Sequence, residues 1–143
     1  MATNNTKAPE KDIVSFNQAL ELCSIGYDEP TFCMYEIENR QLCLCHIDEE
    51  GLYMPDKDLH APTKGQVFRW FRERYLLDGL ILPQDQSALS PLPLYFTAVI
   101  SYNDGILKEL FNTTNKDDLL HYDTYEEAEN ACIDKLIEIA KQK

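Results

Sequence analysis

The segment from Leu94 to Tyr102 constrains the fold of this chain more than any other stretch. If it is extended, one set of side chains points to each side: Leu94, Phe96, Ala98, Ile100 and Tyr102 to one, and Tyr95, Thr97, Val99 and Ser101 to the other. The dipeptide Asp104-Gly105 follows almost directly and is typical of a tight antiparallel hairpin. We therefore expect Ile106 to Phe111 to pair back as a second strand. If no helix covers the Tyr95 and Val99 face, that face would form an apolar patch for a partner.

Three segments show helical periodicity, and the C-terminal one is the clearest. Thr124 is its N-cap, and Glu127 completes a Thr-x-x-Glu capping box. The apolar stripe expected to be buried comprises Tyr125, Ala128, Cys132, Leu136 and Ile139, widened by Ile133, Ile137 and Ala140.

The two other predicted helices lie in the first half of the chain. Ser15 caps a helix from Phe16 to Ile25, which Gly26 closes. Thr63 caps a second helix from Lys64 to Leu76, which Asp78-Gly79 is expected to stop. One broad face of this second helix is apolar and carries Val67, Phe68, Trp70, Phe71 and Tyr75.

The remaining strands and loops complete a locally connected α+β pattern. Further short strands are expected at Thr31–Glu38, Leu42–Ile47, Leu80–Leu82 and Leu119–Tyr122. Loops are expected at Pro55–Pro62, Pro83–Pro93 and Asn112–Asp118. We predict a mobile polar tail over residues 1–12 and a single α+β domain over residues 13–143. Its antiparallel sheet would have about four to five strands, with three helices packed mainly on one face.

Charge narrows the classes of partner. The chain has 143 residues, with 13 Lys and Arg against 25 Asp and Glu, so its formal net charge is −12. Such a chain repels a phosphate backbone, so we expect a protein partner rather than direct nucleic-acid binding. A more specific alternative is that the acidic chain mimics a nucleic acid and occupies the basic groove of another protein. No apolar run is long enough to cross a membrane, and the N-terminus lacks a signal peptide, so we expect a cytoplasmic protein with reduced thiols.

The cysteines allow a metal site but favour core thiols. Cys43 and Cys45 would face the same side of a strand, with Cys33 on the partner strand and His46 on the other face. Zinc sites commonly use Cys-x-x-Cys turns, which this spacing does not provide. We therefore predict no metal site and no cofactor.

No nucleophile, metal-protease or phosphate-loop pattern surrounds His46, His60 or His121, so no catalytic residue is assigned. His60, in a proline-bounded loop, is the most accessible of the three by position. A small enzyme with a site near His60 or Cys43 remains an alternative function.

One local basic group stands out on the second predicted helix: Arg69, Trp70, Arg72 and Arg74. Arginine and tryptophan are frequent binding anchors, so these residues are a candidate interaction patch. A phosphate or nucleic-acid contact through the arginines is a further alternative. Otherwise the tryptophan belongs to the core and the arginines pair with carboxylates.

Three segments together resemble a known group of proteins. They run from Ser15 to Pro30, from Gln66 to Glu73, and from Tyr125 to Ile139. The chain resembles a group of short proteins, without an assigned activity, that are encoded in phages and prophage-like elements of Bacteroides-type gut bacteria. The resemblance implies a bacterial or phage origin and carries over no functional residue. We expect a small soluble, non-enzymatic protein-binding or accessory module.

Overall fold

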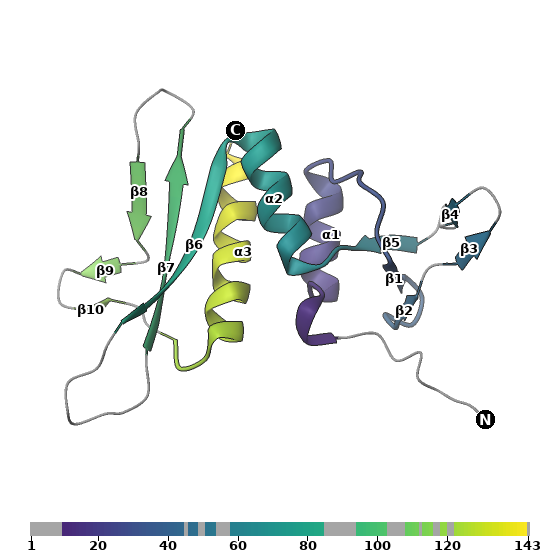
Figure 1. Ribbon diagram of the computed structural model, residues 1–143, viewed down its shortest axis with the longest axis horizontal. Coiled ribbons are helices and arrows are strands. Elements are labelled where there is room, and N and C mark those ends of the chain that lie inside the picture. Colours follow the sequence, from purple (N-terminus) through teal and green to yellow (C-terminus); the bar gives the residue numbers. More distant parts are fainter. Residues whose placement is uncertain are drawn as a thin grey trace. The chain divides into compact units, whose positions relative to one another are not determined.

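The computed structural model describes residues 10–44, 46–48, 51–53, 58–84, 94–102, 108–111, 113–115, 118–119 and 122–142. The fold is α+β with antiparallel strand pairing, as the sequence predicts (Figure 1). The chain divides into two compact units, Met1–Val67 and Phe68–Lys143. The boundary falls inside one continuous helix, and the single domain expected from the sequence stays a prediction.

The described helices and strands have the following bounds. The helices are a short 3₁₀ helix η1 (Glu10–Asp12), α1 (Phe16–Ser24), α2 (Lys64–Tyr75) and α3 (Tyr125–Lys141). The strands are β1 (Cys33–Glu36), β2 (Leu42–Leu44), β3 (His46–Asp48), β4 (Gly51–Tyr53), β5 (Asp58–Ala61), β6 (Leu77–Gln84), β7 (Leu94–Ser101), β8 (Lys108–Phe111), β9 (Thr113–Asn115) and β10 (Asp118–Leu119).

The predicted helix starts are confirmed by their hydrogen bonds. The Ser15 hydroxyl accepts from the backbone N–H of Gln18 at 3.1 Å, and the Gln18 side chain accepts from the Ser15 N–H at 2.9 Å. Thr63 and Gln66 form the same reciprocal pair before α2. The Thr124 hydroxyl accepts from the Glu127 N–H at 3.1 Å. Each cap satisfies backbone donors that the first turn of a helix leaves unpaired.

In the first unit, β1 is the centre of a three-stranded antiparallel sheet ordered β2-β1-β5. Met34 lies opposite both Cys43 and His60. Because directly opposed residues project to the same side of a sheet, these three side chains share one face. Both faces are packed: Met34 is buried on this one, and on the other Cys33 and Ala61 form a buried cluster with Ile13. Helix α1 packs against β5.

In the second unit, β6, β7 and β8 form an antiparallel sheet, and α3 packs against β6 and β7 (Figure 1). Leu77 of β6 and Val99 of β7 are 0% and 1% exposed. The buried stripe of α3 consists of Ala128, Cys132, Ile133, Leu136, Ile137 and Ala140. Tyr125, expected within that stripe, is instead 46% exposed.

The structure removes the apolar patch proposed on β7. Val99 is buried, and the Tyr95 ring packs edge-on against the Tyr125 ring with centroids 5.7 Å apart. Helix α3 therefore covers the face that carries Tyr95, Thr97 and Val99. Among the described side chains of β6, β7 and the residue after β7, Leu82 and Tyr102 are large, apolar and exposed, and by the strand register they belong to the opposite face.

Several other expectations require correction. The described strands belong to separate small sheets rather than to one sheet of four to five strands, because most pairings are local hairpins. The expected loop Pro55–Pro62 contains β5, and the expected loop Asn112–Asp118 contains β9 and the start of β10. The strand predicted at Leu42–Ile47 is divided into β2 and β3.

The end of α2 also differs from expectation. Asp78-Gly79 does not stop the helix but lies inside β6; the helix ends at Tyr75, and Leu76 adopts a positive φ of 57°. The predicted tail falls mainly on residues 1–9, outside the described residues, whereas Glu10–Asp12 form η1. The Asp104-Gly105 turn also lies outside them, although β7 and β8 pair antiparallel as predicted.

Candidate functional site

A small cavity in the first unit brings together two chemically active side chains that are far apart in sequence. Its volume is about 40 Å³, and it is lined by Ala19, Leu22, Cys23, Tyr27 and His60. Helix α1 contributes the first three residues, and β5 contributes the histidine. The cavity therefore combines a thiol and an imidazole with a mainly apolar wall.

The chain bends between these two elements through Gly26. Gly26 has a φ of +98°, and the Tyr27 N–H donates to the Leu22 carbonyl oxygen at 2.9 Å. This left-handed closure of α1 suits a glycine, as the sequence predicts. It returns the chain so that the buried Tyr27 ring meets the His60 ring edge-on, with centroids 6.3 Å apart.

Hydrogen bonding fixes the tautomer of His60. The buried Thr31 hydroxyl donates its single proton to the Cys33 carbonyl oxygen at 2.7 Å. Thr31 Oγ1 also lies 3.2 Å from Nδ1 of His60, and because its proton is committed it can only accept there. Nδ1 therefore carries the ring proton. In the neutral ring, Nε2 is then the nitrogen with an available lone pair.

The environment also keeps that ring neutral. Burial lowers the pKa of His60 below its ordinary value of 6.5, and the nearby Asp28 carboxylate opposes this shift only in part. A neutral imidazole with Nδ1 held by a neighbour is the form that accepts a proton at Nε2.

The cysteines weighed in the sequence as an alternative metal site are not assembled as one in the described residues. Cys33 and Cys43 lie at adjacent positions of the β1–β2 register and therefore on opposite faces. The Cys43 thiol donates to the Glu36 carboxylate at 3.3 Å. Cys45 and His121 lie outside the described residues, as does the side chain of His46. Within the described part, no three His, Cys, Asp or Glu side chains are grouped to hold a metal ion.

The structure divides the candidate patch on α2. Trp70 is only 3% exposed and packs against Phe71 and Tyr75 at centroid distances of 5.1 and 5.4 Å. Trp70 is therefore a core residue and not an exposed anchor, whereas Arg69, Arg72 and Arg74 are exposed.

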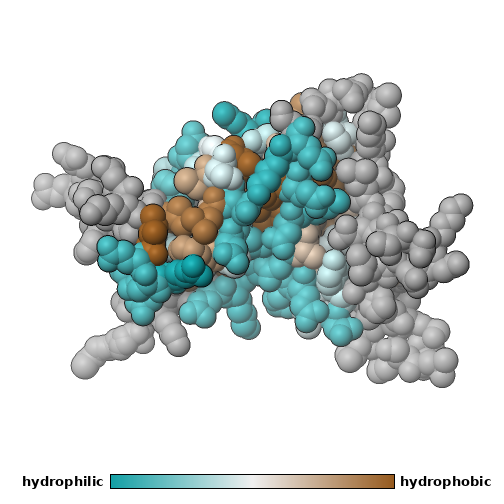
Figure 2. All heavy atoms as spheres, turned by 180° about the vertical axis from the view of Figure 1, so that it is seen from behind, coloured by the Kyte–Doolittle hydropathy of each residue, from teal (hydrophilic) through white to brown (hydrophobic). Residues whose placement is uncertain are grey.

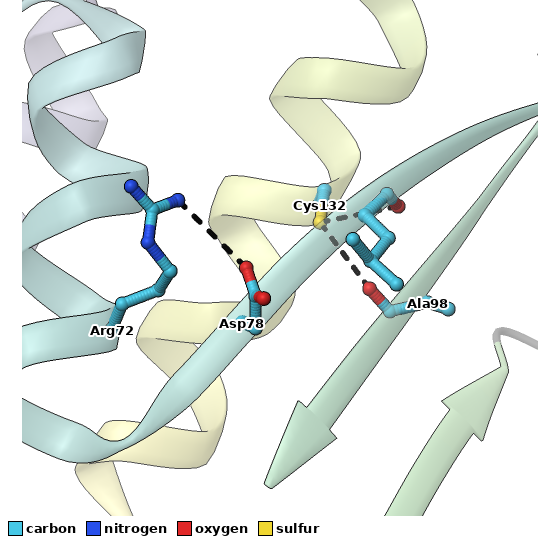
Figure 3. A network of polar contacts seen from close by, with 5 residues as sticks. Arg72, Asp78, Ala98 and Cys132 are labelled. Carbon is cyan, nitrogen blue, oxygen red and sulfur yellow. Dashed lines mark hydrogen bonds and ion pairs between the residues drawn. The ribbon is translucent and has the colours of Figure 1, made fainter.

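The arginines do not form one surface. Arg69 and Arg72 are three residues apart and share a helix face, but Arg74 projects about 160° away from Arg72 around the helix. Arg72 forms an ion pair with Asp78 at 3.8 Å, in which both side chains are partly exposed (Figure 3). The charge available for a phosphate is thus smaller than the sequence suggests.

Cys132 is a second thiol with a clear role. Its sulfur lies 3.9 Å from the Ala98 carbonyl oxygen and 4.0 Å from that of Leu80, so it can donate weakly to the sheet (Figure 3). Burial raises the pKa of this thiol to about 12. Cys132 therefore stays protonated and is structural.

Sequence reasoning found His60 but missed its surroundings. It assigned His60 to a loop and Cys23 only to an apolar helix face, so it did not bring the two residues together. The sequence did carry one signal for a strand here: the apolar residues Leu59 and Ala61, both buried in the structure, alternate with the polar His60 between them. That pattern is typical of a strand.

Comparisons with protein-family models, curated proteins and solved structures found no match to this chain. No helix in the described part of the chain is long and apolar enough to span a membrane. The function is therefore argued from the geometry of the chain itself.

Proposed function

We propose that this protein is a non-enzymatic protein-binding module that contacts its partner through the β1–β2 hairpin. The observation that carries the proposal is the exposure of large apolar side chains along this hairpin and the residue before it. Phe32 is 64% exposed, Ile37 47% and Leu44 46%. Figure 2 shows hydrophobic side chains reaching the surface between hydrophilic ones. Large apolar side chains exposed at a surface favour a protein interface.

The backbone of β2 supports the same surface. In the described sheet, β2 is the terminal strand and pairs with β1 alone. An edge strand presents backbone N–H and C=O groups to which an extended segment of another protein can add. The occupant that fits this hairpin is therefore an extended partner segment with apolar side chains at alternate positions.

The packing of the second unit is consistent with a binding surface elsewhere. We propose that α2 and α3 cover the same face of the β6–β7 sheet. A side chain starting at Gly79 would meet Phe68 of α2 at 2.7 Å and Cys132 of α3 at 2.9 Å, so both helices converge on this glycine. Trp70 is also buried, packed against Phe71 and Tyr75, which removes the strongest anchor from the arginine group.

The alternatives have less support. The net charge of −12 and the separation of Arg69 from Arg74 around the helix disfavour binding of an extended polyanion such as a nucleic acid. The cavity of about 40 Å³ is far smaller than the several hundred Å³ typical of pockets for organic ligands. A bacterial cytoplasmic setting and a mobile-element origin, implied by the resemblance, remain part of the proposal.

The test is affinity capture from bacterial lysate at physiological salt. The wild-type chain is compared with a Phe32→Ser, Leu44→Ser double variant. The matched control is Leu20→Ser with Leu82→Ser, because these side chains are 42% and 41% exposed and lie off the hairpin. We expect the hairpin variant to retain at least about ten-fold less partner than the wild-type chain, since each anchor side chain contributes more than about 1 kcal/mol to binding.

Hydrogen exchange of the captured complex then locates the contact. Binding by strand addition is expected to slow the exchange of backbone amides in Leu42–Leu44. The exchange of amides in α1 should stay unchanged. The proposal is wrong if the hairpin variant retains the same proteins as wild type, or if the wild-type chain reproducibly retains none. Retention that is lost with Arg69→Gln and Arg72→Gln, and falls steeply with salt, would instead favour the arginine surface.

A further inference from the structure

We infer that the cavity between α1 and β5 is a thiol oxidation site, in which Cys23 reacts with hydrogen peroxide and His60 transfers the proton. The site is independent of the hairpin surface. It is assembled from a thiol, a positioned imidazole and a small, partly open space beside both.

The size of the cavity selects the co-reactant. A volume of about 40 Å³ has room for one to three water-sized molecules. Cys23 and His60 both line this space, so a molecule held in it lies beside a thiol and an imidazole. Hydrogen peroxide has two heavy atoms and fits inside this space. The alkyl group of an organic hydroperoxide does not fit and would have to stay outside, at the exposed side of Cys23.

The thiol is accessible and its neighbour is prepared for proton transfer. Cys23 is exposed at the end of α1, in contrast to the buried Cys33 and Cys132. His60 donates through Nδ1 to Thr31, so Nε2 is the proton acceptor of the ring. Ala19 and Leu22, each 1% exposed, form the apolar wall of the cavity.

The reaction balances without any further group. Nε2 of His60 takes the Cys23 thiol proton, and the thiolate attacks one peroxide oxygen. The S–O bond forms as the O–O bond breaks, and the departing hydroxide takes the proton from the imidazolium to become water. Sulfur is oxidised by two electrons and peroxide is reduced, so the products are Cys23 sulfenic acid and one water molecule.

The experiment measures oxidation of each cysteine in the full chain. The protein is treated with hydrogen peroxide, the sulfenic acid is trapped with dimedone, and labelled peptides are quantified by mass spectrometry. Cys43 is the internal reference, since it is a partly exposed thiol that is hydrogen-bonded to the Glu36 carboxylate rather than to an imidazole. We expect Cys23 to be labelled at least about ten-fold faster than Cys43.

The decisive variant is His60→Asn. Its side-chain amide can still donate to Thr31 but cannot accept a proton at neutral pH. Cys23 labelling should fall about ten-fold while Cys43 labelling is unchanged. A second measurement on the wild-type chain needs no variant: replacing hydrogen peroxide by tert-butyl hydroperoxide should slow Cys23 selectively. The inference is overturned if Cys23 reacts no faster than Cys43, if His60→Asn leaves its rate unchanged, or if peroxide size has no effect.

Discussion

At the residue scale, Gly79 lies where side chains of two helices meet β6 closely. An added Cβ would lie 2.7 Å from Cε1 of Phe68 and 2.9 Å from Sγ of Cys132, distances that force these side chains or their helices to shift. We predict that Gly79→Ala lowers the free energy of unfolding by about 1–3 kcal/mol, the usual cost of overpacking a core. Urea denaturation followed by circular dichroism measures this loss.

Gly65 provides the control for that substitution. It is exposed in α2, and the nearest atom to its added Cβ is Thr63 Oγ1 at 4.0 Å. Gly65→Ala should raise stability by about 0.5–1 kcal/mol, because alanine restricts the unfolded chain and favours a helix. Equal effects of the two alanines would show that Gly79 is not held by close packing.

Leu76 is a residue whose backbone conformation conflicts with its side chain. Its φ of 57° is left-handed and its side chain is 46% exposed, so little packing offsets the strain. Leu76→Gly should therefore raise the free energy of unfolding by about 0.5–1 kcal/mol. Arg40, at a φ of 58°, is the contrast, because its guanidinium lies 5.1 Å from the centroid of the Phe16 ring. Thermal melts of the two variants test this. Arg40→Gly should gain less stability than Leu76→Gly, because it loses this cation–π contact.

At the element scale, the start of α3 depends on one side chain. The Thr124 hydroxyl accepts the Glu127 N–H at 3.1 Å, and Thr124 is exposed, so its loss leaves no cavity. Thr124→Ala should cost about 1 kcal/mol of unfolding free energy, whereas Thr124→Ser should cost little because the hydroxyl is retained. Chemical denaturation of both variants tests this; a serine as damaging as the alanine would contradict the role of the cap.

The elements that the sequence predicts well are those determined by neighbouring residues. Capping pairs and a helical stripe are local signals, and α1, α2 and α3 start where Ser15, Thr63 and Thr124 place them. Alternation likewise identifies β7, but it cannot say which of its two faces α3 covers. That choice depends on packing between elements that are distant in sequence.

The elements that the sequence misses are those created by distant pairing. Asp58–Ala61 is only four residues long and lies between two prolines, so its local signal is that of a loop. It becomes β5 by pairing with β1, which places His60 opposite Met34. The cavity that joins His60 to Cys23 depends on this pairing, so the candidate site could not be predicted from local patterns.

At the scale of the whole molecule, the shifted pKa values of two side chains, His60 and Cys132, make stability depend on pH. Burial lowers the pKa of His60 below 6.5, so the unfolded chain binds more protons than the folded chain as pH falls through 6.5. Burial raises the pKa of Cys132 from 9.0 to about 12, so the folded chain binds more protons than the unfolded chain above pH 9. Stability should therefore fall on both sides of a plateau between about pH 6.5 and 9.

The two limbs of this profile can be separated by substitution. Between pH 9 and 10, below the ordinary tyrosine pKa of 10.0, loss of the Cys132 proton from the unfolded chain alone should lower unfolding free energy by about 1 kcal/mol. Cys132→Ala should remove that alkaline slope even though it lowers stability at every pH, and His60→Asn should flatten the acid limb. Urea titrations at a series of pH values measure both slopes. An alkaline slope that survives in Cys132→Ala would mean that other groups destabilise the fold at high pH, and that the buried thiol does not limit its alkaline range.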